Sequence, residues 1–208
     1  MEYNKSLINS VILTEEKIKA LFKEKSVVTI AIDGRCGSGK STFAELLSKK
    51  FDCNVFHMDD FYLPLEKRTK ERLDEAGGNI DRQRFLKEVI VPARKGDAVF
   101  YKAFDCKVQS LKAPVTMKPK SIVITEGSYS CHNDFYDLYD LHIFLTVSPE
   151  IQKERIIKRN GEEGYKAFEN KWIPFEEKYF KEQDVKSKCE LVLEMGLNIK
   201  YYVCDGNL

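Results

Sequence analysis

The chain has 208 residues, a formal net charge of +1 and 43% hydrophobic residues. That length suits one α/β domain with insertions and allows a sizeable hydrophobic core. The near-neutral charge supplies no long-range attraction to nucleic acid or to a membrane surface, so neither is expected as a partner. The basic stretch at residues 66–72 alternates with acidic residues, which favours a solvated face over an RNA-binding patch.

The six cysteines form no C-x-x-C pair, which disfavours a zinc site or a thioredoxin-type motif. The N-terminal residues do not resemble a signal peptide. The longest apolar runs have the length of strands, far below the roughly 20 residues of a membrane helix. We therefore expect free thiols, a cytoplasmic location and no membrane partner.

The first predicted element is an amphipathic helix over residues 14–25, with Thr14 as its N-cap. An apolar, β-branched run at residues 27–32 follows and is typical of a buried parallel strand. Residues 41–51 then show the spacing of a helix with one apolar face. This part of the chain therefore predicts a strand, a short glycine-rich loop and a helix.

The loop has the sequence Gly34-Arg35-Cys36-Gly37-Ser38-Gly39-Lys40-Ser41. It fits G-x-x-x-x-G-K-[ST], the phosphate-binding P-loop, in which glycines let backbone N–H groups turn toward a phosphate at a helix N-terminus. A Rossmann dinucleotide loop is disfavoured because position 42 is a threonine. Lys40 would reach the β- and γ-phosphates, and the Ser41 hydroxyl would bind Mg²⁺. The residues expected to bind ATP are Gly34, Cys36, Gly37, Ser38, Gly39, Lys40, Ser41 and Thr42.

A second short strand is predicted over residues 54–58. Residues 63–81 contain few apolar residues and predict a long loop, which in a compact domain is usually functional or disordered. A helix is predicted over residues 82–91. Three short strands of a small antiparallel flap are predicted after it, over residues 98–101, near Val108 and near Val115. Residues 63–120 together would form a flap beside an acceptor site.

Buried strands are predicted over residues 121–125 and 141–147. Ser148 then reads as a helix N-cap with Pro149 at the first helical position, and this helix would end near Arg159. The remaining predicted elements are a helix over residues 165–180 interrupted at Pro174, a last core strand over 190–194 and an edge strand over 199–203.

Strands that alternate with helices imply a mostly parallel sheet covered on both faces. Ligands of such sheets bind at the carboxyl ends of the strands. This rule brings together Asp33, the pair Asp59 and Asp60, and Glu126, because each follows a predicted strand.

Phosphoryl transfer needs bound phosphates, a metal and a group that orients or deprotonates the acceptor. Glu126 is expected to bind Mg²⁺ directly or through water, and the alternative is a structural acid at a strand end. Asp59 could accept the proton of an acceptor hydroxyl, and the alternative is that Asp59 or Asp60 caps the following turn. Asp33 is expected to fix the loop or to reach the metal through water.

Arg155 and Arg159 lie four residues apart and share a helix face. They could close over the phosphates in the transition state, or they could form a solvated basic helix end. His57 is interpreted as a core or edge histidine whose hydrogen bonds are satisfied. An aromatic stripe is interpreted as core packing and consists of Trp172, Phe175, Tyr179 and Phe180.

Together these segments resemble the uridine kinase and phosphoribulokinase group of P-loop kinases. The resemblance covers about residues 27–193 and rests on four segments, which are residues 34–42, Met58-Asp59-Asp60-Phe61-Tyr62, Thr125-Glu126-Gly127, and residues 155–159 with the aromatic-rich helix after them. It implies an α/β P-loop NTPase with a nucleoside-monophosphate-kinase-like parallel sheet of strand order 2-3-1-4-5, flanking helices and a short lid. On this basis residues 1–208 would form a single P-loop kinase domain.

The resemblance also implies roles for individual residues. Asp59 would be the catalytic base and Glu126 the glutamate linked to Mg²⁺, while Arg155 and Arg159 would be lid arginines. Lys40 would hold the phosphates of ATP.

The acceptor site departs from the pattern of that group. Uridine kinases resemble one another in a Tyr-Asp-Phe segment followed shortly by a histidine, and residues 101–107 have no histidine nearby. The expected function is ATP- and Mg²⁺-dependent phosphorylation of a hydroxyl group on a small molecule. Uridine or cytidine is the first choice of acceptor, and pantothenate, another riboside, a sugar or glycerate are the alternatives.

A function from another class is a P-loop ATPase or switch that acts on a protein partner. Residues 63–81 and 101–106 look like walls of an acceptor pocket beside Asp59, which favours the kinase. A homo-oligomer is compatible with the sequence, and the choice between ATP and GTP stays open.

Overall fold

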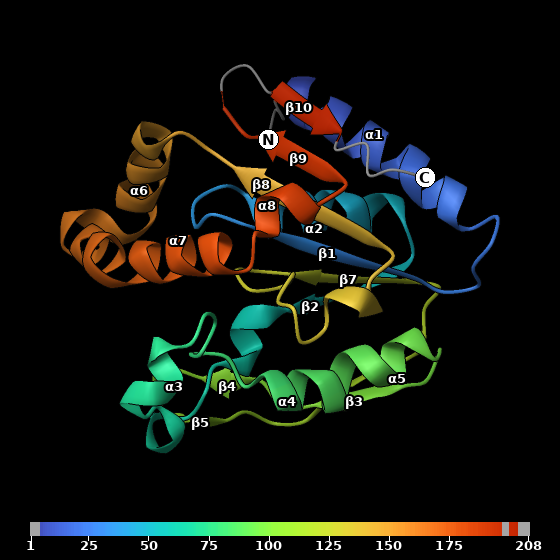
Figure 1. Ribbon diagram of the computed structural model, residues 1–208. Coiled ribbons are helices and arrows are strands. Elements are labelled where there is room, and N and C mark those ends of the chain that lie inside the picture. Colours follow the sequence, from blue (N-terminus) through green and yellow to red (C-terminus); the bar gives the residue numbers. More distant parts are fainter. Residues whose placement is uncertain (1–4, 197–199, 204–208) are drawn as a thin grey trace.

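A six-stranded sheet runs through the middle of the protein, in the order β10-β9-β8-β1-β7-β2 (Figure 1). The computed structural model describes residues 5–196 and 200–203. The strands of the sheet are β1 (Val28–Gly34), β2 (Cys53–His57), β7 (Ile122–Glu126), β8 (Leu141–Thr146), β9 (Leu191–Glu194) and β10 (Lys200–Val203). All neighbours pair in parallel except β10, which pairs antiparallel with β9. The five parallel strands, counted along the chain as 1 (β1), 2 (β2), 3 (β7), 4 (β8) and 5 (β9), lie in the order 2-3-1-4-5 when the sheet is followed from β2. This is the predicted order, and the predicted P-loop α/β fold is confirmed.

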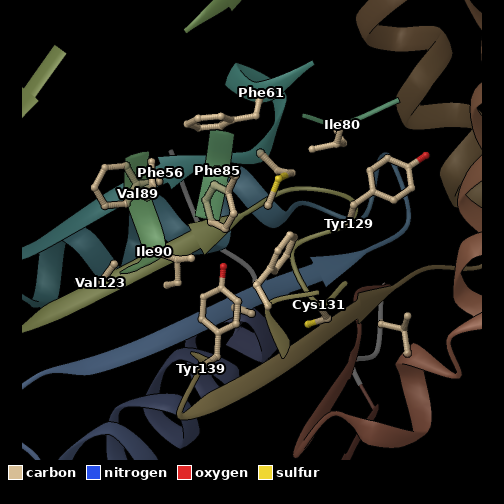
Figure 2. Close-up of a cluster of buried hydrophobic side chains, with 14 of the residues drawn as sticks. Phe56, Phe61, Ile80, Phe85, Val89, Ile90, Val123, Tyr129, Cys131 and Tyr139 are labelled. Carbon is tan, nitrogen blue, oxygen red and sulfur yellow. The ribbon is translucent and has the colours of Figure 1, made fainter. Parts of the chain in front are cut away.

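The two faces of the sheet carry two separate hydrophobic cores, because successive side chains of a strand point to opposite sides. On one face, Ile30 and Ile32 of β1 pack with residues of α1 (Lys5–Leu21) and α2 (Lys40–Lys50). On the other face, Ala31 joins a cluster rich in aromatic residues. Figure 2 shows this second cluster, in which the ring of Phe85 lies among residues from the strands and the helical segment that covers them.

Part of the second face is covered by one helical segment made of α4 (Arg82–Phe85), the π-helical η3 (Leu86–Ile90) and α5 (Val91–Arg94). The helix predicted over residues 82–91 is confirmed and extends to Arg94. Pro92 is tolerated near its C-terminal end because it follows the wider π turn, which relieves the clash of a proline ring with the preceding turn.

The predicted start of the N-terminal helix is wrong. Helix α1 begins at Lys5 and ends at Leu21, so Thr14 lies inside it. The Thr14 hydroxyl donates a hydrogen bond to the Ser10 carbonyl oxygen at 2.9 Å. A threonine can satisfy its hydroxyl in this way within a helix, and for this reason its presence alone does not mark a helix start.

The region between β2 and β7 contains short elements that no periodic pattern predicts. They are η1 (Met58–Phe61), η2 (Leu65–Lys67) and α3 (Lys70–Asp74). The predicted antiparallel flap is present but consists of two separate pairs of strands: β3 (Val99–Tyr101) pairs with β6 (Val115–Met117), and β4 (Phe104–Asp105) pairs with β5 (Ser110–Leu111). The strand predicted near Val108 is wrong, because Val108 lies in the turn between β4 and β5. Figure 1 shows this flap on the same side of the sheet as α3, α4 and α5.

The C-terminal part begins as predicted, since the Ser148 side chain caps α6 (Pro149–Ala167). Gly161 breaks this helix with φ 75° and ψ 170°. The predicted interruption at Pro174 is wrong, because the chain continues from the π-helical η5 (Phe168–Trp172) directly into α7 (Ile173–Glu182). As at Pro92, the proline follows a π turn. The remaining short elements are η4 (Tyr136–Leu138) and α8 (Val185–Lys188).

The predicted edge strand is present as β10 from Lys200 onward, and Ile199 lies outside the described residues. The five cysteines in the described part of the chain are free, and Cys204 lies outside it. Within residues 5–196 and 200–203, no helix combines the length and the apolar character needed to span a membrane. The assignment of residues 1–208 to a single domain stays a prediction.

Candidate functional site

The P-loop connects the carboxyl end of β1 to the N-terminus of α2, as its sequence predicts. Gly37 and Gly39 have φ values of 74° and 99°, which favour glycine, and they let the loop turn back on itself. Gly34 meets a different requirement, since a Cβ atom there would lie 1.9 Å from the Leu145 carbonyl oxygen on β8. The first glycine of the motif therefore allows two strands to approach closely, and the later ones shape the loop.

Lys40 and Ser41 open α2 and point to different parts of the site. Lys40 Nζ donates to the carbonyl oxygens of Gly34 at 2.6 Å and Arg35 at 3.0 Å. The Ser41 hydroxyl lies 3.1 Å from both carboxylate oxygens of Glu126. The structure thus brings together the two residues that the sequence assigns to Mg²⁺.

Glu126 has a second partner that the sequence does not reveal. His57 Nδ1 lies 2.6 Å from Glu126 Oε1, and this contact raises the pKa of His57. The two residues meet because β2 pairs in parallel with β7 and places His57 opposite Glu126 in the register. The interpretation of His57 as an edge histidine with a satisfied hydrogen bond agrees with this geometry, since β2 is an edge strand.

Asp59 follows β2 directly, in the short helix η1. Its surroundings remove bulk water and raise the pKa of its carboxyl group, and the negative charges of Glu126 and Glu176 act in the same direction. The nearby Lys40 opposes this shift. Asp60 points elsewhere and accepts a hydrogen bond from the Tyr101 hydroxyl at 3.2 Å. Of the two neighbouring aspartates, only Asp59 therefore faces the P-loop.

A single cavity of about 670 Å³ joins the P-loop, Asp59 and the lid. Its size lies in the range of small-molecule sites. It is lined by Cys36, Gly37, Gly39, Lys40, Ser41, Thr42, Asp59, Tyr62, Arg68, Cys106, Gln109, Glu126, Gly127, Ser128, Tyr129, Arg155, Arg159, Phe168, Trp172 and Glu176. Two predicted loop residues do not line it, because Gly34 packs against β8 and the Ser38 side chain is buried.

Both lid arginines line this cavity from α6. Arg155 Nη1 donates to the carbonyl oxygens of Gly37 at 3.1 Å and Ser38 at 3.3 Å. The Arg159 guanidinium lies 5.5 Å from the centre of the Phe168 ring. The helix that carries these arginines thus faces the P-loop, and the alternative of a solvated basic helix end is disfavoured.

Asp33 connects three parts of the site and is fully buried. Its carboxylate accepts hydrogen bonds from the backbone N–H groups of Gly34, Tyr129 and Cys131 and from the Tyr179 hydroxyl. Burial raises the pKa of Asp33 to about 6. The sequence left two roles open for Asp33, which are fixing the P-loop and reaching the metal through water. This geometry supports the first role.

Glu176 of α7 is a site residue that sequence reasoning missed. It is only 5% exposed, and its carboxylate accepts hydrogen bonds from the Cys36 backbone N–H and the Ser128 hydroxyl. The neighbouring Glu177 forms an ion pair with Arg35. A signal was present, because Glu176 shares a helix face with the buried aromatic residues of the predicted stripe. An acid on a buried face requires a partner.

The aromatic stripe has a mixed role. Tyr179 and Phe180 are buried as predicted, and Tyr179 also bonds to Asp33. Trp172 lines the cavity, so its interpretation as pure core packing is wrong. The break of α6 at Gly161 turns the following helical segment back toward the P-loop, and sequence spacing does not reveal that turn.

Comparison with known proteins gives a consistent result. A family model described as an AAA domain matches residues 30–178, more than half of the chain. Phosphoribulokinase from Synechocystis sp. is 25% identical over 153 residues, which cover 69% of this chain and 45% of that protein. Uridine kinase from Clostridium botulinum is 27% identical over 149 residues, which cover 65% of this chain and 68% of that protein.

A solved structure described as a possible uridine kinase from Bacillus stearothermophilus shares the fold, with a TM-score of 0.68 at 18% identity. The match covers 89% of this chain and 98% of that structure. The chain spans less than half of the phosphoribulokinase that it matches. The predicted resemblance to the uridine kinase and phosphoribulokinase group is confirmed, and the chain belongs to the AAA domain family.

Proposed function

We propose that this protein transfers the γ-phosphoryl group of ATP to a hydroxyl group of a small molecule, with Mg²⁺. One observation carries the proposal: a single cavity contains the P-loop lysine Lys40, the Ser41–Glu126 pair and the carboxylate of Asp59. The named relatives, which are kinases of uridine and phosphoribulose, support the same class of reaction.

The residues of the site fit Mg²⁺ and the phosphates of ATP. A hydroxyl and a carboxylate are oxygen ligands of the kind that Mg²⁺ prefers, and Mg²⁺ in such sites is held by one or two protein groups together with substrate phosphates and water. In the described part of the chain, no group of three or more His, Cys, Asp or Glu side chains is placed to hold a metal. Bound Mg²⁺ would offset the negative charge of the phosphates.

The protein residues would then act in distinct ways. Lys40 would exchange its bonds to the loop carbonyls for bonds to phosphate oxygens. Asp59 would accept the proton of the acceptor hydroxyl while the hydroxyl oxygen forms a bond to the γ-phosphorus. The bond from that phosphorus to the β–γ bridging oxygen breaks, and its electron pair stays on ADP. Arg155 and Arg159 would stabilise the charge on the transferring group.

Uridine or cytidine is the acceptor that the named relatives suggest first. Pantothenate, another riboside, a sugar or glycerate are the other acceptors considered from the sequence. A P-loop ATPase or switch would need Asp59 only to orient water, and it would not need a cavity whose walls also include Tyr62 and Cys106. These additional wall residues favour a kinase.

The test compares Asp59→Asn with Asp60→Asn. Both substitutions keep the size of the side chain and remove one charge, but only Asp59 lines the cavity. Loss of a general base costs about 10²- to 10⁴-fold in rate. We expect this loss in kcat for Asp59→Asn, with little change in the affinity for ATP, and a much smaller effect for Asp60→Asn.

The pH profile gives a second readout. Because the pKa of Asp59 is raised, its basic form is lost as the pH falls through a value above the ordinary range of an aspartate. The wild-type enzyme should therefore lose kcat/KM on the acidic side, and Asp59→Asn should lack this limb. Full acceptor phosphorylation by Asp59→Asn would refute the assigned mechanism. ATP hydrolysis by the wild type without any phosphorylated acceptor would support the ATPase or switch.

A further inference from the structure

The arginines of the protein divide into two groups. Five of the eight form ion pairs with carboxylates, and these are Arg35, Arg72, Arg82, Arg84 and Arg94. The other three have no ion pair with a described carboxylate, and all three line the cavity: Arg68, Arg155 and Arg159. The unpaired guanidinium groups of the described chain thus gather in one place, and a negatively charged ligand would supply the missing partners.

Arg155 bonds to the P-loop, and Arg159 follows it by one turn on the same helix, so both suit the phosphates of ATP. Arg68 comes from elsewhere, at the end of the short helix η2 in the segment between β2 and α4. Its Nε donates to the Leu63 carbonyl oxygen at 2.5 Å, which fixes the position of the guanidinium group. Arg68 therefore reaches the cavity from a segment other than the P-loop and α6.

One terminal nitrogen of Arg68, Nη2, is buried without a hydrogen-bond partner. A buried donor without a partner costs free energy, and this cost is larger for a charged group. The nearby arginines differ from Arg68 because their charges are paired: Arg72 and Arg82 pair with Glu75, and Arg84 pairs with Glu88. Such an isolated charge in the wall of a cavity points to a ligand that pairs with it.

Arg68 and Asp59 both line the cavity, and both lie near enough to Cys106 to act on its thiol. The positive charge of Arg68 lowers the pKa of the Cys106 thiol and the negative charge of Asp59 raises it, although burial has the largest effect on that thiol. Tyr62 and Gln109 line the cavity as well. A small molecule whose hydroxyl faces Asp59 would therefore extend toward Arg68.

We propose that Arg68 binds an anionic group of the acceptor, a carboxylate or a phosphate monoester, while the acceptor hydroxyl faces Asp59. This inference rests on the proposed function, and it names the class of acceptor. The planar guanidinium group matches the geometry of carboxylate and phosphate oxygens. A neutral nucleoside such as uridine would leave the buried Nη2 donor without an anion, so the inference places neutral acceptors second.

The experiment measures ADP production from ATP and Mg²⁺ with three sets of acceptors, each compared with the rate without acceptor, which reports ATP hydrolysis alone. The neutral set is uridine and cytidine, the carboxylate set is glycerate and pantothenate, and the phosphate set is ribose 5-phosphate and ribulose 5-phosphate. Three proteins are compared: the wild type, Arg68→Gln, and the control Lys67→Gln. The control removes a positive charge one residue away, from a side chain that faces Asp81 and does not line the cavity.

We expect the wild type to use one of the two anionic sets with a kcat/KM at least about 100-fold above that for the neutral set, and the favoured set identifies the anion. Arg68→Gln should raise the KM for that acceptor by about 10- to 100-fold, the effect of one lost charge-assisted hydrogen bond. Its KM for ATP should not change, and Lys67→Gln should resemble the wild type. If Arg68→Gln does not fold, Arg68→Lys replaces it, because lysine keeps the positive charge but lacks the planar guanidinium group. Arg68→Lys should raise the KM for the acceptor by a smaller factor.

Two results would overturn the inference in distinguishable ways. If uridine or cytidine is the best acceptor and its KM does not respond to Arg68→Gln, the protein is a kinase whose acceptor does not use Arg68. If the wild type phosphorylates no acceptor of the three sets but still hydrolyses ATP, the proposed function itself fails, and this inference fails with it.

Discussion

Three buried carboxylates hold the segments of this site together through hydrogen bonds. Asp33 accepts four hydrogen bonds and ties β1, the loop after β7 and α7 together. Glu126 meets Ser41 from α2 and His57 from β2. Glu176 receives hydrogen bonds from the P-loop and from Ser128. Each of these acids is buried and keeps at least two donors, which offsets the cost of removing it from water.

The proposed role of Glu126 is tested by Glu126→Gln, which keeps the shape of the side chain and removes its charge. We expect the Mg²⁺ concentration for half-maximal turnover to rise by about 10- to 100-fold, the usual effect of losing a group that supports a metal. The measurement is a Mg²⁺ titration of turnover at saturating ATP. Glu45→Gln, on the exposed side of α2, is the control. A titration curve like that of the wild type would make Glu126 a structural acid.

At the scale of secondary structure, short segments such as η1 determine where the reactive side chains lie. Asp59 lies in η1, whose first residue, Met58, packs closely against Gly127 after β7. A Cβ atom at Gly127 would lie 2.8 Å from the Met58 Cβ atom, and the φ of Gly127 is 134°. The position of Asp59 therefore depends on a glycine in another element, because only a glycine lets η1 and β7 approach so closely.

This dependence predicts different effects for two glycine substitutions. Gly127→Ala should displace η1 and lower kcat by about 10-fold or more, since misplacement of a catalytic group by about 1 Å can cost 10²-fold. Gly96→Ala is the control, because Gly96 also has a positive φ of 77° but its Cβ would lie no closer than 3.7 Å to a neighbour. It should reduce the free energy of unfolding by about 1 kcal/mol and leave kcat unchanged. Equal kcat values for the two variants would contradict the argument.

The lid, which comprises α6, η5 and α7, has a path that was not visible in the sequence. The chain turns at Gly161 and passes through the π-helical η5 into α7. Figure 1 shows α6 and α7 together at one end of the sheet, where α7 returns toward the start of β9. The contacts of Glu176 and Glu177 with the P-loop hold α7 next to the cavity. A change in the P-loop on nucleotide binding would therefore act directly on the lid.

For the molecule as a whole, ligand binding should appear as added stability. A non-hydrolysable ATP analogue with Mg²⁺ at about 100 times its Kd should raise the free energy of unfolding by about 2.7 kcal/mol. For a protein of this size that corresponds to a rise in Tm of roughly 5–11 °C. Lys40→Ala should lose most of this rise, because the lysine would contact the phosphates. If the ligand raises the Tm of Lys40→Ala as much as that of the wild type, Lys40 does not contact the bound nucleotide. The Tm of the variant without ligand is the control for folding.

Much of the fold was predictable because the signals are local. The apolar strands, the glycine spacing of residues 34–41 and the cap at Ser148 each depend on neighbouring residues. The carboxyl-end rule then placed Asp59 and Glu126 near the P-loop without a structure. The predicted start of α1 was wrong because the Thr14 hydroxyl bonds to a carbonyl oxygen inside the helix and does not cap it. The predicted break at Pro174 was wrong because the proline follows a π turn.

The sequence by itself determined the fold class, the P-loop and the acids that meet at the strand ends, because periodicity and motif spacing are properties of adjacent residues. The tertiary structure alone decided the pairing of His57 with Glu126, the insertion of Glu176 at the P-loop and the isolation of Arg68 in the cavity wall. These depend on strand register, on the turn at Gly161 and on which arginines find carboxylates. No local pattern encodes them, since they arise only when distant segments pack together.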